Sequence, residues 1–344
     1  MSEIFIHGLG AVSPAGWGVA ALRAALEKNE PLPAAPLPRP GWPHPLSVRS
    51  VPAATPRPAF LAHARLRRTS PVAQFAAAAA LEALGSDAAH VSAGEIRVGV
   101  VLAVLAGCVN YTRRFYDETL RDPASASPLV FPETVFNAPA SHIAALIGST
   151  AINYTLVGDA GTFLQGVALA ADWLGDGQVD GCLVIGADEK DWLVADAFHL
   201  FQSRAVVSEG AGAIYLRRES AERPVELRAV TGSHPFLKNH SRLDATRSMR
   251  RELPNAAGRA LLCDSRQNIS RLDAAENAAW ADWPGTVCSP KKILGEGFVA
   301  AAAWQCVAAL DALQDGRFDT ANVSVVGSNQ QAIGAQFAVS PVPV

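Results

Sequence analysis

Apolar positions along the chain alternate between short continuous runs and longer amphipathic stretches. Runs that are apolar or that alternate with a period of two predict strands at 3–10, 96–105, 152–157, 179–187, 213–216, 225–230, 260–263 and 323–326. Longer stretches rich in alanine and leucine predict helices at 17–28, 69–85, 107–122, 137–146, 162–174, 273–280 and 298–313. Because both kinds of element are strongly apolar, the pattern predicts a covered, layered α/β architecture.

Two local features add to this organisation. Ten of the 23 prolines lie between Pro31 and Pro58, which predicts an extended surface excursion without regular structure. Gly158-Asp159-Ala160-Gly161 opens one small-residue helix and Gly295-Glu296-Gly297 opens another. This echo is compatible with two similar halves.

Composition narrows the class of protein. The 344 residues are 49% hydrophobic and only 18% charged, which excludes a disordered chain and predicts a large core, with part of the surface covered by a partner. The net charge of −3 offers no broad basic face, so no nucleic-acid partner is expected. No apolar run approaches a membrane span of about 20 residues, and the N-terminus has no signal-peptide pattern, so a cytoplasmic location is expected.

Familiar catalytic and cofactor motifs are not found. The sequence has no phosphate loop, no GxSxG elbow and no HExxH, and Gly8-x-Gly10 lacks the third glycine of a dinucleotide site. Eight histidines show no ligand spacing, and none follows His240. We therefore expect neither a cofactor nor a metal. Five widely spaced cysteines without a CxxC pair predict free thiols in a reducing compartment: Cys108, Cys182, Cys263, Cys288 and Cys306.

Six segments between residues 4 and 216 resemble, in order, the β-ketoacyl synthases of the thiolase superfamily. They are IFIHGLGAVSPAGWGVAALRAAL, IRVGVVLA, SPLVFPETVFNAPASHIAALIG, INYTLVGDAG, VDGCLVIGADE and SEGAGAIYL. The second half matches best at DAAENAAW and PKKILGEGFVAAAAW. The resemblance implies a thiolase-like fold of two related halves in an αβαβα arrangement. Residues 1–216 would form the first half and 217–344 a shortened second half, with a substrate pocket near their junction.

The family's catalytic residues do not carry over to this sequence. Its chemistry uses a cysteine at the N-terminus of a buried helix, two histidines and a supporting lysine. The cysteine position falls on Ala160, the first histidine on Ser265 (or on Asp264, if the loop shifts by one), and the second on Glu296. Lys291 alone matches, and VGSNQQAIGA at 326–335 replaces the glycine-rich gating segment. Ala160 cannot form an acyl-enzyme, and an ionised Glu296 would repel a developing enolate by about 4 kcal/mol at about 4 Å.

Structural explanations compete with functional ones at several positions. Asp159 and Glu296 are also explained as carboxylates that favour helix starts, Lys291 as the partner of Glu296 or of a helix C-terminal carbonyl, and Ser265 as a solvated loop residue. Five aromatic side chains either belong to the core or, as the resemblance implies, shape the floor of an acyl tunnel across a dimer interface: Tyr111, Phe115, Tyr116, Phe131 and Phe136. The strand that matches the family's two-fold axis consists of Ile152, Asn153, Tyr154, Thr155, Leu156 and Val157.

Three functions follow from this resemblance and its gaps. The first is a non-catalytic subunit that resembles the chain length factors of type II polyketide and aryl-polyene systems. It would pair with an active β-ketoacyl synthase in a heterodimer, contact acyl carrier protein indirectly and shape the tunnel in fatty acid or polyketide-type biosynthesis. The second is an enzyme with a rebuilt site, in which Asp159, Ser265, Glu296 and Lys291 converge to hydrolyse an acyl thioester. The third is a homodimeric acyl-binding scaffold.

Overall fold

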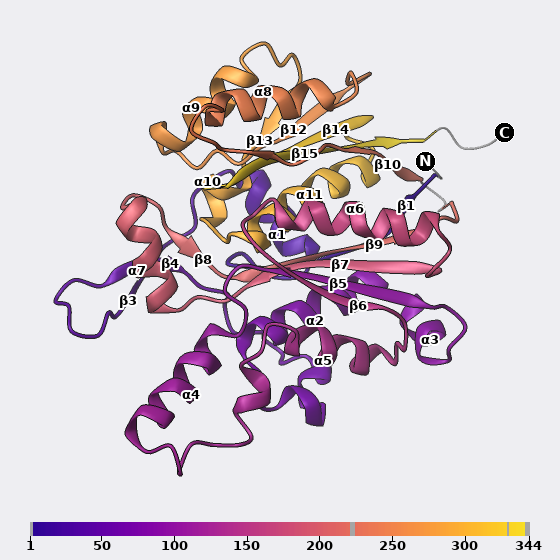
Figure 1. Cartoon of the computed structure of the whole chain (residues 1–344). Coiled ribbons are helices and arrows are strands. Elements are labelled where there is room, and N and C mark those ends of the chain that lie inside the picture. Colours follow the sequence, from indigo (N-terminus) through magenta and orange to yellow (C-terminus); the bar gives the residue numbers. More distant parts are fainter. Residues whose placement is uncertain (1–2, 221–223, 329, 341–344) are drawn as a thin grey trace.

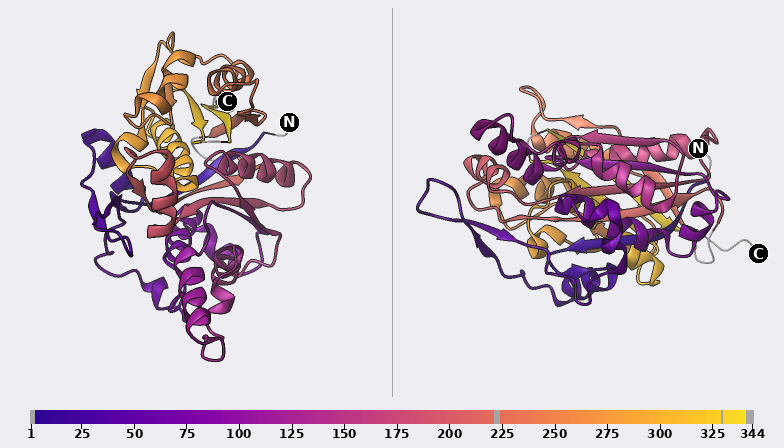
Figure 2. Two further views of the ribbon diagram at one scale, coloured as in Figure 1. Left: turned by 60° about the vertical axis from the view of Figure 1, so that its left-hand side comes forward. Right: turned by 90° about the horizontal axis from the view of Figure 1, so that it is seen from below.

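The computed structural model of the chain describes residues 3–220, 224–328 and 330–340. Its helices and strands lie in five layers: helices, a sheet, helices, a second sheet and helices again (Figure 1). In the left view of Figure 2 the orange and yellow C-terminal elements lie at the top of the molecule, and purple and magenta helices lie at the bottom. The layered α/β thiolase-like architecture expected from the sequence is confirmed.

The two sheet layers are one continuous path of hydrogen-bonded strands. The N-terminal layer contains, in order, β1 (Phe5–Ser13), β9 (Gly210–Arg217), β7 (Gly181–Asp188), β5 (Val98–Val104) and β6 (Asn153–Val157). The C-terminal layer contains β13 (Thr286–Cys288), β12 (Ala260–Cys263), β14 (Thr320–Val326), β15 (Gln331–Val339) and β10 (Val225–Val230). Pairing of Phe5 with Glu226 joins the layers through β1 and β10. β6 and β13 are therefore the outer edges of the path.

Helices cover both faces of each sheet layer. The central layer contains α1 (Val19–Lys28), α6 (Thr162–Gly175), α10 (Pro290–Leu294) and α11 (Val299–Gln314). Below the N-terminal sheet in Figure 1 lie α2 (Pro71–Leu84), α3 (Asp87–Ser92) and α5 (Ala138–Ile147). Above the C-terminal sheet lie α8 (Arg242–Glu252) and α9 (Ser270–Ala279). α4 (Val109–Arg121) and α7 (Trp192–Phe201) project from one side of the body. No helix among these described residues is long and apolar enough to cross a membrane.

Small residues allow the helices to approach the sheets closely. A Cβ on Gly8 or Gly10 of β1 would lie 1.8 Å from the Ala83 carbonyl oxygen or 1.9 Å from that of Ala79, both on α2. These distances are far below any contact that real atoms make, so the Gly8-x-Gly10 pattern is explained by helix packing. α11 is buried along almost its whole length between the two sheet layers.

Several segments differ from the sequence expectations. The excursion at 31–58 is not without regular structure, because β3 (Ala35–Leu37) and β4 (Leu46–Arg49) form a small sheet with β8 (Val207–Ser208). The expectation was wrong because strand pairing with a distant segment supplies hydrogen-bond partners that proline density does not reveal. α7, α8 and β15 were not anticipated. The remaining short elements are β2 (Gly16–Trp17), β11 (His234–Pro235) and the 3-10 turns Ala59–Ala62, Ala64–Leu66 and Phe131–Glu133.

Candidate functional site

Ala160 lies in the tight turn that leads from β6 into α6, where the resemblance places a nucleophile. Its side chain is buried, so the position presents only a methyl group. Asp159 fixes the turn, because its Oδ1 accepts the Gly161 N–H at 3.1 Å and the Gln331 side-chain amide at 3.0 Å. Burial raises the pKa of Asp159 against these hydrogen bonds. The turn therefore has the geometry of a helix start, without a group that could be acylated.

Lys291 and Glu296 form a buried ion pair in the same part of the structure. The Lys291 ammonium lies 2.8 Å from Glu296 Oε2, and both side chains are only 1% exposed. Glu296 Oε2 also accepts the Gln267 amide at 3.3 Å, and Oε1 accepts the Phe298 backbone N–H at 2.9 Å. Of the two structural roles expected for Lys291, the pairing with Glu296 is the one observed.

Backbone hydrogen bonds to a neighbouring segment also fix the position of Glu296. Its N–H donates to the Val206 carbonyl and its carbonyl accepts the Ser208 N–H, each at 2.8 Å. Phe298, at the start of α11, has a φ of 50°, which is an uncommon conformation for a large side chain. Asp159 and Glu296 each accept the N–H of the residue that precedes a central helix, Gly161 before α6 and Phe298 before α11. The helix-start explanation for both carboxylates therefore agrees with the structure.

Ser265 was expected in a solvated loop, and that expectation is wrong. It is 5% exposed, and its hydroxyl donates to the Ser324 carbonyl at 3.1 Å and accepts the Val326 N–H at 3.0 Å. Its own N–H donates to Glu276, whose pKa burial raises to about 8. The neighbouring Asp264 is buried and paired with Arg266. Burial arises because the C-terminal ends of β12 and β14 meet here, which sequence spacing alone does not reveal.

A cavity of about 460 Å³ lies beside Ala160. Asp159, Ala160 and Glu296 line one side, and Leu105, Phe198 and Phe298 contribute apolar wall. The rings of Phe198 and Phe298 meet edge to face with centroids 5.1 Å apart. Ser265 does not line this cavity. The convergence expected for a rebuilt enzyme site therefore holds for Asp159 and Glu296. Lys291 does not line the cavity and meets the site only through its ion pair with Glu296, and the expectation fails for Ser265.

α7 brings an apolar rim to this cavity that sequence reasoning missed. Leu200 and Phe201 line it and are 77% and 74% exposed. Asp191 caps the helix by accepting the Leu193 N–H at 2.9 Å. An aspartate before the apolar run WLVADAFHLF was thus the available signal for this helix.

The segment that replaces the gating loop begins at the last residue of β14 and runs into the first five residues of β15. Its expected range of 326–335 includes Asn329, which lies outside the described residues. Arg242, from α8, donates to the carbonyls of Val326 and Ser328 and stacks on Phe236. Burial lowers the pKa of this guanidinium, while nearby carboxylates, Glu276 first, act against that shift. Arg242 was not among the expected site residues, because it lies on α8, a helix that was not anticipated from the hydrophobic pattern.

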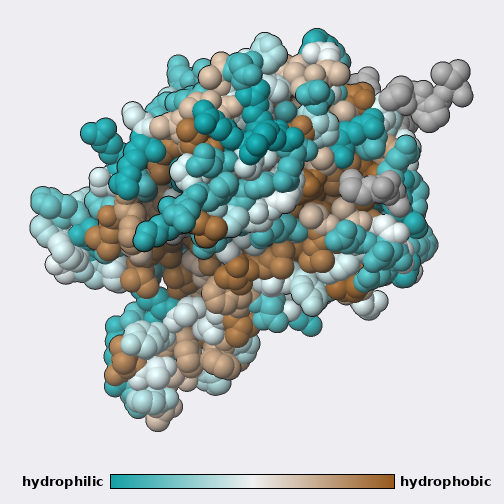
Figure 3. Space-filling view, turned by 45° about the horizontal axis from the view of Figure 1, so that its top comes forward, coloured by the Kyte–Doolittle hydropathy of each residue, from teal (hydrophilic) through white to brown (hydrophobic). Residues whose placement is uncertain are grey.

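None of the five aromatic residues lines the cavity. Tyr111, Phe115 and Tyr116 belong to α4, and Phe115 packs on Phe131 with ring centroids 5.4 Å apart. Tyr116, Phe131 and Phe136 are 62%, 56% and 45% exposed, so the core alternative is wrong for these three. Figure 3 shows apolar side chains gathered in a band across the molecule and on the arm that projects below it. A role in a tunnel shared with a second subunit remains a prediction.

β6 has one free edge on the described part of the chain. It pairs only with β5, and the side chains of Tyr154 and Val157 are 56% and 55% exposed. An unpaired strand edge with apolar side chains beside it is a template for pairing with another chain.

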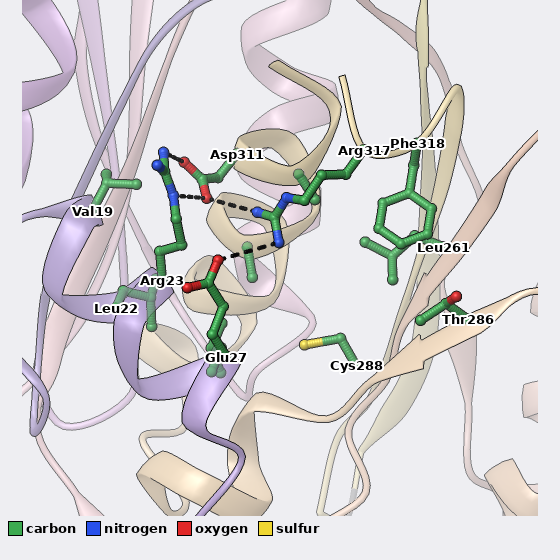
Figure 4. A pocket seen from close by; sticks show the side chains of 13 residues that line it. Val19, Leu22, Arg23, Glu27, Leu261, Thr286, Cys288, Asp311, Arg317 and Phe318 are labelled. Atoms are coloured by element: carbon green, nitrogen blue, oxygen red, sulfur yellow. Dashed lines mark hydrogen bonds and ion pairs between the residues drawn. The ribbon is translucent and has the colours of Figure 1, made fainter. Parts of the chain in front are cut away.

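A second, smaller cavity of about 170 Å³ lies near the opposite edge of the sheet path, between α1, α11, β12 and β13 (Figure 4). Asp311 holds the Arg23 guanidinium through two bonds of 2.6 and 2.8 Å and also pairs with Arg317 at 3.3 Å. Leu22, Leu261 and Phe318 give the cavity apolar walls, and Cys288 contributes a thiol. No group of three or more metal-ligating side chains occurs among the residues described.

Comparisons with known proteins place this geometry in context. The family model for the β-ketoacyl synthase N-terminal domain matches residues 1–222. The ishigamide ketosynthase/chain length factor superposes with a TM-score of 0.81 at 20% identity, over 98% of this chain and 100% of that chain. A β-ketoacyl synthase from Burkholderia phymatum STM815 gives 0.81 at 16% identity, over 99% and 100%.

A third structure contains a type II polyketide synthase acyl-carrier protein in complex with its ketosynthase bound to the hexaketide. It gives a TM-score of 0.75 at 14% identity, over 98% of this chain and 99% of that chain. No curated protein matches the chain. At identities of 14–20%, the TM-scores of 0.75–0.81 show that this chain shares the fold of these structures. The family model covers residues 1–222, which is well over half of the sequence.

Proposed function

The chain belongs to the β-ketoacyl synthase family, and from this premise we propose that it is a non-catalytic, chain length factor-like subunit. It pairs with an active β-ketoacyl synthase in a heterodimer and shapes the acyl tunnel of fatty acid or polyketide-type biosynthesis, including the aryl-polyene type. Acyl carrier protein contacts the complex mainly through the active partner. The proposal concerns the role of this chain within its family, and it requires no cofactor or metal.

The observation that carries the proposal is the state of the family's catalytic position. Ala160 occupies the turn before α6, so no acyl-enzyme can form there. The ammonium that could polarise a thioester is bound by Glu296 at 2.8 Å, and the Phe298 N–H also donates to that carboxylate. Decarboxylative condensation needs donors aimed at a developing oxyanion. At this site the carboxylate of Glu296 already accepts those donors.

The exposed apolar surface supports a partner. Tyr154 and Val157 belong to β6, which has a free edge, and Tyr116 on α4 with Phe131 and Phe136 in the segment after it are 45–62% exposed. Burying such a patch removes apolar area from water, and aromatic side chains are typical anchors of interfaces. This surface is the candidate for the heterodimer contact and for the aromatic floor of a shared tunnel.

The test is co-expression with an active β-ketoacyl synthase from the same organism. We expect the two chains to co-purify as a heterodimer, and the length of the product to change when this subunit is replaced or omitted. Val157→Glu, at 55% exposure on β6, should weaken the complex at least tenfold because a charge is buried at the contact. Val287→Glu is the matched control, since Val287 is 41% exposed on β13 at the opposite edge. It should leave the complex unchanged.

Two results would contradict the proposal. One is a failure of the wild-type chains to associate while product length is independent of this subunit. The other is acyl thioester turnover by the purified chain that is lost in Glu296→Ala, which would favour the rebuilt-enzyme alternative.

A further inference from the structure

Cys288 presents its thiol to the smaller cavity, far along the sheet from Ala160. It lines the cavity together with Leu22, Leu261 and Phe318, and its sulfur points into the space that they enclose (Figure 4). Arg23 and Arg317 also line the cavity, and their side chains are 38% and 40% exposed, so the cavity reaches solvent on their side. A molecule the size of a small peroxide therefore fits against this thiol.

The other cysteines are sealed from solvent. Cys108, Cys182, Cys263 and Cys306 are all buried, whereas Cys288 is only partly so, and all five are free thiols as expected. Burial raises the pKa of Cys108, Cys182 and Cys306 well above the ordinary range. Cys288 is thus the one thiol in the described chain that a small molecule reaches in the folded state.

Cys263 lies beside Cys288 on the adjacent strand. The two are register partners on the adjacent parallel strands β12 and β13, and the Asp264 N–H donates to the Cys288 carbonyl at 3.0 Å. The adjacent Cys288 side chain and then burial raise the pKa of Cys263. Neighbouring strands lie about 4.7–4.9 Å apart, within the 4.4–6.8 Å between Cα atoms that a disulfide spans.

We propose that Cys288 and Cys263 form an oxidation-sensitive pair, in which Cys288 is the site attacked by hydrogen peroxide and Cys263 is the resolving thiol. In the first step the Cys288 thiolate attacks one peroxide oxygen and the O–O bond breaks. The products are a sulfenic acid on Cys288 and one water. In the second step the Cys263 sulfur attacks the sulfenic sulfur, and hydroxide leaves and is protonated to a second water. Two thiols are oxidised, one peroxide is reduced and one disulfide remains.

The position of the pair makes the second step geometrically accessible. β13 has three residues and forms the outer edge of the sheet path, so only β12 holds it on that side and small shifts toward Cys263 are possible. The resulting bond would join the strands that lead into Ser265 on one side and into α10 with Lys291 on the other. This inference is independent of any pairing with a ketosynthase.

The experiment oxidises the native full-length chain with a small excess of hydrogen peroxide, blocks free thiols after denaturation and maps the peptides by mass spectrometry. We expect the peptides of Cys263 and Cys288 to be linked, with a mass two hydrogens below the sum of the two free-thiol peptides, and the link to be removed by dithiothreitol. Cys288→Ala should leave Cys263 unoxidised. Cys263→Ala should leave a sulfenic acid on Cys288 that dimedone traps. Cys182→Ala, at a buried cysteine in another layer, should behave as the wild type.

The proposal is overturned if Cys288 proceeds to sulfinic acid while Cys263 is still alkylated after denaturation. It is also overturned if Cys288 stays reduced under conditions that oxidise an equimolar free thiol. The wild-type peptide map decides between these outcomes by itself, even where a variant does not fold.

Discussion

Removing either member of the Lys291–Glu296 pair should strongly destabilise the chain, and the two losses should not be equal. The ammonium and carboxylate are 2.8 Å apart and each side chain is 1% exposed. Without Lys291, Glu296 keeps two donors, Gln267 and the Phe298 N–H. Without Glu296, the ammonium of Lys291 has no hydrogen-bond partner left among the residues described. Glu296→Leu should therefore cost more than Lys291→Met.

The magnitude follows from the geometry. At 2.8 Å and an effective dielectric constant of about 20, the attraction is about 6 kcal/mol, and the cost of desolvating both ions offsets much of it. Breaking a buried pair by removing one partner typically costs about 3–5 kcal/mol, because the other charge remains buried. The double variant, with Lys291→Met and Glu296→Leu, leaves no buried charge, so its cost should be well below the sum of the two single costs.

Urea denaturation followed by far-ultraviolet circular dichroism measures the free energy of unfolding of each variant, and the four values close a double-mutant cycle. Lys28→Met is the control, because Lys28 and Glu30 form a pair of similar length, 2.9 Å, at 71% and 65% exposure. It should barely move the unfolding midpoint. Single losses under about 1 kcal/mol, or a double variant as unstable as the sum, would refute the reasoning that this pair is buried and coupled.

Three further predictions address the rest of the molecule. Burial raises the pKa of Asp188 to about 7. The stability that its protonated form contributes is therefore complete below about pH 4 and is lost as pH rises toward 7, at up to roughly 1.4 kcal/mol per pH unit. Asp188→Asn should flatten this slope when the free energy of unfolding is measured between pH 4 and 7. Gly212→Ala should lower the free energy of unfolding by about 1–3 kcal/mol in thermal or urea unfolding. The reason is that the added Cβ would lie 2.7 Å from the Cβ of Ala303 and 3.0 Å from the carbonyl carbon of Ala303. Gly175→Ala is the control, because a Cβ there would meet no atom within 4 Å. Wild-type protein incubated with acyl-coenzyme A should gain no acyl mass, since Ala160 offers no nucleophile, and an adduct in the intact-mass spectrum would contradict this.

Some elements that sequence reasoning missed carried a signal, and others did not. α8 begins with a capping box, in which Ser241 and Asp244 each accept the other's backbone N–H, and that spacing was readable in the sequence. β15 is different, because all but one of its residues are buried and its glutamines and small residues show neither a strand nor a helix period. Only its long antiparallel pairing with β14 makes it a strand.

The sequence by itself determined the layered fold, the position of Ala160 before a central helix, and the substitution of Glu296 beside the matching Lys291. These follow from local patterns and from motifs whose order is fixed along the chain. The tertiary structure alone decided that Glu296 and Lys291 neutralise each other away from water, that Ser265 is buried at the meeting of β12 and β14, and that Cys263 lies against Cys288. The physical reason is that burial and charge pairing depend on which distant segments pack together. Strand register and helix crossing set those contacts, and residue spacing does not encode them directly.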